Sequence, residues 1–105
     1  MIRAQLDGVT LAEAEHTVVV EGNHYFPPES LNMDHFERSR ARSLCPWKGV
    51  ASYYSVIVGD QRYKNAAWTY RHPSPLVRRI KDHVAFWPFV AIEVDDREAT
   101  VGRRS

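Results

Sequence analysis

The chain has 105 residues, enough for one domain around one hydrophobic core. Its formal net charge is only +1 and 44% of its residues are hydrophobic, so the composition excludes a disordered chain and does not favour a nucleic-acid partner. Cys45 is the single cysteine, which excludes an internal disulfide and a zinc site made of several thiolates.

The first residues carry charges and form no apolar segment of the kind found in signal peptides. No apolar run approaches the roughly 20 residues that a membrane-spanning helix needs. We therefore expect a cytoplasmic protein without membrane contact, present as a monomer or a homodimer.

The N-terminal part predicts three short strands. Residues 2–6 alternate between apolar and polar side chains, and Asp7-Gly8 is a two-residue hairpin turn that leads into a return strand over 9–12. Residues 17–21 are rich in β-branched side chains and predict a third strand, which ends at Gly22-Asn23.

Little regular structure is expected between residues 24 and 43. Two prolines, at positions 27 and 28, cannot donate hydrogen bonds to a sheet, so no central strand continues through them. Residues 29–33 suit a single helical turn. Residues 34–43 are polar and positively charged without clean periodicity, which indicates a surface loop or a frayed helical piece.

The second half predicts further strands and one helix. Residues 51–58 form the longest predicted strand, and Gly59-Asp60 turns the chain into a strand over 61–70. Ser74 suits an N-cap and Pro75 a first helical position, which predicts a short helix up to Lys81. The last predicted strands are residues 84–87 and 90–94. The chain is thus expected to form one mainly β, antiparallel domain over residues 1–94 with one or two short helices, followed by a polar tail over 95–105.

Residues 45–49 read Cys-Pro-Trp-Lys-Gly and run straight into the strand that begins Ala-Ser-Tyr-Tyr-Ser. A segment that only packs a core would hold Val, Ile and Leu, whereas this one holds a thiol, an indole, an ammonium group and two phenols. Aromatic walls with a few directional polar groups are typical of a small-molecule pocket.

The motifs recur in a characteristic order: VEGNHYFP at 20–27, CPWKG at 45–49 with ASYY at 51–54, AAW at 66–68 with Tyr70, and VAF at 84–86. In this order the chain, from about Gly8 to Val94, resembles the domain of unknown function 427 family. The resemblance implies a small domain of curved antiparallel sheets of the β-tent kind. The family is sometimes labelled a nucleotidyltransferase family, which implies Mg²⁺-dependent nucleotide binding.

The residues themselves lack the parts of a nucleotidyl transfer site. Such a site needs carboxylates that hold Mg²⁺ and donors that cradle phosphates. The chain has no Gly-Ser followed by Asp-x-Asp and no P-loop, and its one acidic pair, Asp95-Asp96, lies in the predicted tail. The histidines lack paired ligand spacing. No metal is expected, and the cofactor is unknown.

The first hypothesis is a binding domain for a small molecule of unknown identity. The pocket would be built from the loop at 24–26, the turn at 45–49, and the strand that carries Trp68 and Tyr70 on one face. Lys48 would hold an anionic group, with Cys45 beside it at the pocket mouth. The alternative is that the same rings form a core. Predicted ligand-binding residues are Tyr25, Trp47, Lys48, Tyr53, Trp68 and Tyr70.

The second hypothesis makes this pocket an enzyme site. Cys45 would be a nucleophile activated by His24 or by Lys48, or Glu21 and His24 would form an acid–base pair. Each has a plainer alternative, since a free cysteine commonly behaves as a small buried hydrophobe and His24 can simply order its loop. A further alternative is a protein-interaction module.

Three arginines at alternate positions, Arg38, Arg40 and Arg42, fall within the segment predicted as a loop. They could contact phosphates, and the alternative is a solvated face.

Overall fold

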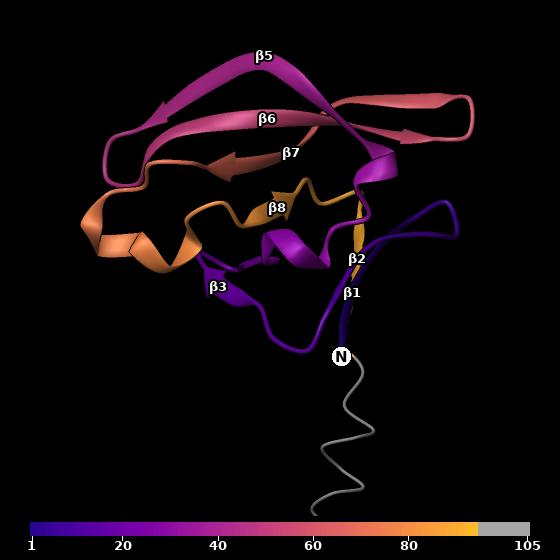
Figure 1. Ribbon diagram of the computed structural model, residues 1–105, viewed down its shortest axis with the longest axis horizontal. Helices are drawn as coiled ribbons and strands as arrows, with labels where there is room; N and C mark the ends of the chain where they lie inside the picture. The colour runs from indigo at the N-terminus through magenta and orange to yellow at the C-terminus, as the bar shows by residue number, and fades with distance from the viewer. Residues whose placement is uncertain (95–105) are drawn as a thin grey trace, which may run out of the picture.

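The computed structural model describes residues 1–94 and shows a mainly β domain, which confirms the predicted fold class (Figure 1). Its strands form antiparallel sheets, and its helices are short 3₁₀ turns. The strands are β1 (Ile2–Leu6), β2 (Val9–Ala14), β3 (Val18–Val20), β4 (Asn23–Tyr25), β5 (Phe36–Cys45), β6 (Gly49–Val58), β7 (Gln61–Tyr70), β8 (Val84–Phe86) and β9 (Ala91–Val94), and the 3₁₀ helices are η1 (Pro28–Ser30), η2 (Met33–His35) and η3 (Pro75–Ile80).

The largest sheet has the order β5-β6-β7-β8, and a second sheet has the order β2-β1-β9. The hairpin β3-β4 forms a third, two-stranded sheet. In Figure 1, β5, β6 and β7 form one layer, with β8, η3 and the β3-β4 hairpin beneath it and β1 and β2 to one side. Phe26 joins the hairpin to the largest sheet, since its N–H donates to the carbonyl of Val84 (2.8 Å) and its carbonyl accepts from the Val84 N–H (2.9 Å).

Two hydrophobic cores fill the space between these sheets. Tyr25 and Phe26 are adjacent in sequence and both fully buried, yet each belongs to a different core, because successive side chains of an extended chain point in opposite directions. The main core consists of Ala4, Leu6, Leu11, Ala12, Ala14, Phe26, Val56, Val58, Ala66, Ala67, Val84, Phe86 and Val90. The second core consists of Val20, Tyr25, Ala51, Tyr70, Val77, Ile80 and Ala85.

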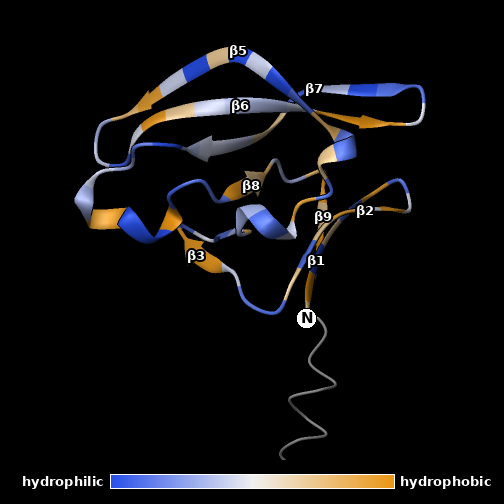
Figure 2. Cartoon of the chain, viewed as in Figure 1, coloured by the Kyte–Doolittle hydropathy of each residue, from blue (hydrophilic) through white to orange (hydrophobic). Residues whose placement is uncertain are grey.

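The prediction of a loop or frayed helix over residues 34–43 is wrong. After η2 the chain forms β5, which pairs with β6 over residues 36–38 and 42–45 and is the outer strand of the largest sheet. Most of its side chains are exposed, and Figure 2 shows hydrophilic residues through its middle. The sequence therefore lacks the apolar face by which a strand is usually recognised, and its alternating arginines are the only trace of the period of two.

Smaller differences concern the remaining elements. β6 spans ten residues but is no longer than β5 or β7. The hairpin turn after β3 lies at Glu21-Gly22, both with positive φ, so that Asn23 already begins the return strand. The predicted helix is η3, a 3₁₀ segment with non-helical backbone angles at Val77. The predicted tail over 95–105 lies outside the described residues.

Candidate functional site

The structure brings together the three segments that were predicted to form a pocket. Tyr25, at the end of β4, has its ring centroid 6.5 Å from that of Trp68 and 6.5 Å from that of Tyr70, both on β7. The indole Nε1 of Trp68 donates a hydrogen bond to the Tyr25 hydroxyl (3.1 Å). Trp68 and Tyr70 therefore share a face of the sheet, as their spacing predicted.

Lys48 ties the turn between β5 and β6 to the same group of rings. Its ammonium lies 5.3 Å from the Trp47 ring centroid and 5.7 Å from that of Tyr70, within the range of cation–π attraction. It also donates to a carboxylate oxygen of Glu21 in the β3-β4 turn, and the Trp47 indole donates to the other oxygen at 3.3 Å. We call Glu21, Tyr25, Trp47, Lys48, Trp68 and Tyr70 the lysine cluster.

The turn itself is fastened to the loop that precedes η3. The backbone N–H of Lys48 donates to the Cys45 carbonyl (3.2 Å), and the Lys48 carbonyl accepts from the Ser74 N–H (2.9 Å). The Ser74 hydroxyl donates to the Trp47 carbonyl (2.7 Å) and does not cap η3, the role predicted for it. Gly49 has a φ of 118°, a region that side-chain-bearing residues avoid.

Charge pairing and burial set the ionisation within the lysine cluster. The hydrogen bond from Lys48 lowers the pKa of Glu21. Burial acts to lower the pKa of Lys48, but the hydrogen bond to Glu21 and the neighbouring tyrosines outweigh it, so that the pKa is raised. Burial also raises the pKa of Tyr25 and raises that of Tyr70 to about 12. At neutral pH the cluster therefore holds an ammonium, a carboxylate and two neutral phenols.

The centre of the lysine cluster is closed to solvent. Tyr25 is 0% exposed, Tyr70 5% and Lys48 7%, whereas Trp47 is 40% exposed. A ligand beside this cluster would meet Trp47 and the Glu21 carboxylate before the buried phenols. Ligand binding by the predicted residues stays a prediction.

The three catalytic candidates do not form one arrangement. The Glu21 carboxylate is held by Trp47 and Lys48, while the His24 ring makes its hydrogen bond with the Thr17 hydroxyl (2.7 Å). Cys45 is a half-buried free thiol that packs against the second core. Catalysis by these residues stays a prediction.

An open groove lies beside the lysine cluster, with a volume of about 420 Å³. Tyr53 lines this groove and also packs against the second core, so it connects the two. Tyr54 packs on the main core, because successive side chains of a strand point to opposite faces of the sheet. We call this cavity the ring groove, and its lining residues are Ala41, Arg42, Ser43, Tyr53, Lys64, Asn65, Trp87 and Phe89.

Of these lining residues, only Tyr53 is predicted from the sequence to lie in a pocket. Trp87 and Phe89 flank Pro88 in the connection between β8 and β9, although the sequence predicts Trp87 as the last residue of a strand. Their exposures, 47% and 53%, are high for rings of this size. Two large aromatic residues around a proline in a turn are the signal by which the groove could have been found.

The raised pKa of Tyr70 predicts a loss of stability in alkali. Because burial raises the folded-state pKa from 10.0 to about 12, the neutral phenol stabilises the folded state fully below pH 10, and this contribution disappears as the pH rises through about 12. We expect Tyr70→Phe to unfold at a similar urea concentration near neutrality and to lose less stability above pH 10 than the wild type. An equal loss of stability above pH 10 in the two proteins would contradict the raised pKa of Tyr70.

Among residues 1–94 no helix has the length and apolar character needed to cross a membrane. The same residues contain no group of three or more His, Cys, Asp or Glu side chains placed to hold a metal ion. No curated protein matches the chain. The family model described as a domain of unknown function (DUF427) matches residues 1–97, and the chain therefore belongs to that family.

Proposed function

We propose that this domain binds a small molecule with a flat apolar part and an anionic group, and that the binding site is the ring groove. The observation that carries the proposal is the pair of half-exposed rings, Trp87 and Phe89, which line one groove together with Tyr53. A volume of about 420 Å³ lies within the range of small-molecule sites.

The exposed rings are held in place from behind. Trp87 packs edge-on against Trp68 (6.0 Å between centroids), and Phe89 packs against Tyr63 (5.7 Å). The Trp87 N–H donates to the Ala66 carbonyl (2.9 Å), which fixes the backbone beside β7. Because the rings are already ordered, a ligand that stacks on them loses little free energy to side-chain ordering.

The lysine cluster supports this groove and need not contact the ligand itself. Trp68 joins the two, since it contacts Tyr25 on one side and Trp87 on the other. The polar end of the ligand would meet Arg42 and Lys64, the two cationic residues of the lining. No observation favours a catalytic role for Cys45, His24 or Glu21 over this binding role.

Anilinonaphthalene sulfonate tests the proposal, because it combines flat rings with one anionic group. We expect saturable binding of one dye molecule to the folded wild type and at least about fivefold weaker binding to Trp87→Ala, since stacking on a ring contributes about 1–3 kcal/mol. Fluorescence titration measures both. Circular dichroism checks that each variant is folded.

Leu76→Ala is the matched control. Leu76 is 78% exposed on η3 and lies outside the ring groove, so its removal also deletes a large exposed apolar side chain. An equal loss of dye binding in both variants, or no loss in Trp87→Ala, would refute the proposal.

A further inference from the structure

A second groove, with a volume of about 550 Å³, adjoins the ring groove. The two share Ala41, Lys64 and Asn65 as lining residues, so one ligand can extend from one into the other. We call the second cavity the cation groove, and its lining residues are Arg38, Ser39, Arg40, Ala41, Arg62, Lys64 and Asn65.

The cation groove concentrates positive charge in a chain that is almost neutral overall. Four of its seven lining residues are Arg or Lys and none is acidic, whereas the net charge of the whole chain is +1. Arg62 is paired with Glu37, its Nε lying 2.8 Å from a carboxylate oxygen. Arg38, Arg40 and Lys64 form no ion pair within residues 1–94. Such a local surplus of unpaired cations attracts an anion.

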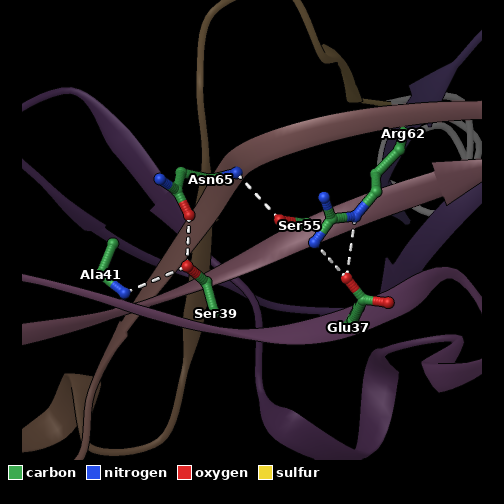
Figure 3. Close-up of polar contacts among 6 residues, drawn as sticks. All are labelled: Glu37, Ser39, Ala41, Ser55, Arg62 and Asn65. Carbon is green, nitrogen blue, oxygen red and sulfur yellow. Dashed lines mark hydrogen bonds and ion pairs between the residues drawn. The ribbon is translucent and has the colours of Figure 1, made fainter.

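Hydrogen bonds across the sheet fix the shape of this groove (Figure 3). Ser39 on β5 donates from its hydroxyl to the Asn65 side-chain carbonyl on β7 (2.5 Å) and accepts from the Ala41 N–H (3.1 Å). The Asn65 N–H in turn donates to the Ser55 hydroxyl (3.1 Å). The pairing of β5 with β6 shifts register between Arg38 and Arg42 at this place.

Asn65 also offers a hydrogen-bond donor to a ligand. Its backbone has a φ of 53°, a left-handed conformation that asparagine tolerates better than most residues. The side-chain oxygen of Asn65 accepts from Ser39 and its backbone N–H donates to Ser55. Its side-chain nitrogen, Nδ2, donates to no other residue among 1–94 and is therefore the group left for a ligand. Asn65 lines both grooves.

We propose that the cation groove binds an oligophosphate group, so that the ligand is an aromatic compound with a chain of two or three phosphates. The phosphate part is held by arginine forks, which bind phosphate oxygens in pairs, and by Lys64 and the Asn65 amide. That the ligand also has an aromatic part rests on the proposed function, in which the rings of the ligand stack on Trp87 and Phe89. No step of this binding needs a metal ion.

A competing explanation is that the arginines only protect the sheet edge. β5 is an outer strand, and charged side chains on such strands prevent pairing with other molecules. Edge protection requires positive charge but no affinity for phosphate. The two explanations therefore predict different effects when the arginines are neutralised.

Calorimetric titration with inorganic tripolyphosphate, at low salt and without Mg²⁺, separates them. We expect the wild type to bind it, and the double variant Arg38→Gln/Arg40→Gln to bind at least about tenfold more weakly. Arg78→Gln/Arg79→Gln is the matched control, because it removes two exposed arginines of η3 and changes the net charge equally. The proposal would be overturned if the wild type did not bind tripolyphosphate or if both double variants lost the same affinity for it. It would also be overturned if Arg38→Gln/Arg40→Gln aggregated but bound tripolyphosphate with unchanged affinity.

Two further probes distinguish its failure from that of the proposed function. We expect Arg38→Gln/Arg40→Gln to bind the dye as the wild type does. If the wild type binds the dye but no tripolyphosphate, the proposed function stands and the phosphate-binding proposal fails. Adenosine triphosphate, which joins a ring system to three phosphates, should bind more tightly than tripolyphosphate and lose this advantage in Trp87→Ala. Binding that requires Mg²⁺, or a single-stranded oligonucleotide that binds more tightly than either probe, would overturn the assignment.

Discussion

Tyr25→Ala is expected to lower the free energy of unfolding by about 3–5 kcal/mol, the range for truncating a large aromatic side chain in a core. Tyr25 is fully buried, and its ring contacts both Trp68 and Tyr70. Truncation would leave a cavity in the second core and the Trp68 indole without its acceptor. Urea unfolding followed by circular dichroism measures the loss.

Tyr25→Phe is the control that separates packing from hydrogen bonding. It keeps the ring and removes only the hydroxyl that accepts from Trp68, so we expect a loss of about 1 kcal/mol. If Tyr25→Ala were no less stable than Tyr25→Phe, the Tyr25 ring would contribute nothing to packing in the second core. The space that the ring occupies would then be a candidate ligand site.

Gly49→Ala is expected to destabilise the domain by about 1–3 kcal/mol or more, the usual contribution of one strained backbone residue. At a φ of 118° an added methyl group is strained, and it would also lie 3.2 Å from the His72 carbonyl oxygen. The change therefore disturbs both the turn and its attachment to the loop before η3. Urea unfolding again reports the difference.

Gly59→Ala provides a matched comparison in the next hairpin turn. Gly59 has a φ of 57°, and a methyl group there would meet nothing within 4 Å, so this variant reports backbone strain alone. Gly49→Ala should be the less stable of the two. Equal stabilities would show that contact with the His72 carbonyl is unimportant and that the turn is free to move.

The hairpins and the fold class were predictable because they depend on local chemistry. Asp7-Gly8 and Gly59-Asp60 are turn pairs whose flanking residues favour extended backbone, and both lie in the hairpin turns of the structure. β5 was missed because an outer strand with both faces largely exposed carries no apolar alternation. Its place in the sheet depends on its pairing with β6, and this pairing cannot be read from the ten residues of β5 alone.

The convergence of Tyr25, Lys48, Trp68 and Tyr70 was predictable from unusual residues placed where strands begin and end. The burial of Tyr25, Lys48 and Tyr70 was not, because exposure depends on what η3 and the β3-β4 hairpin cover. The two grooves were harder still to foresee. Both combine residues of β5 and β7, two strands that are not adjacent in the sheet, and the ring groove adds residues from the connection between β8 and β9. Only the folded chain brings these segments together.

The adjacent pair Tyr25 and Phe26 has a consequence for how the domain unfolds. Each residue is anchored in a different core, and the backbone of Phe26 is bonded in both directions to Val84. Unfolding of either core would therefore displace the same short segment of backbone, residues 25 and 26. We therefore expect the two cores to unfold together, in one transition on heating or in denaturant.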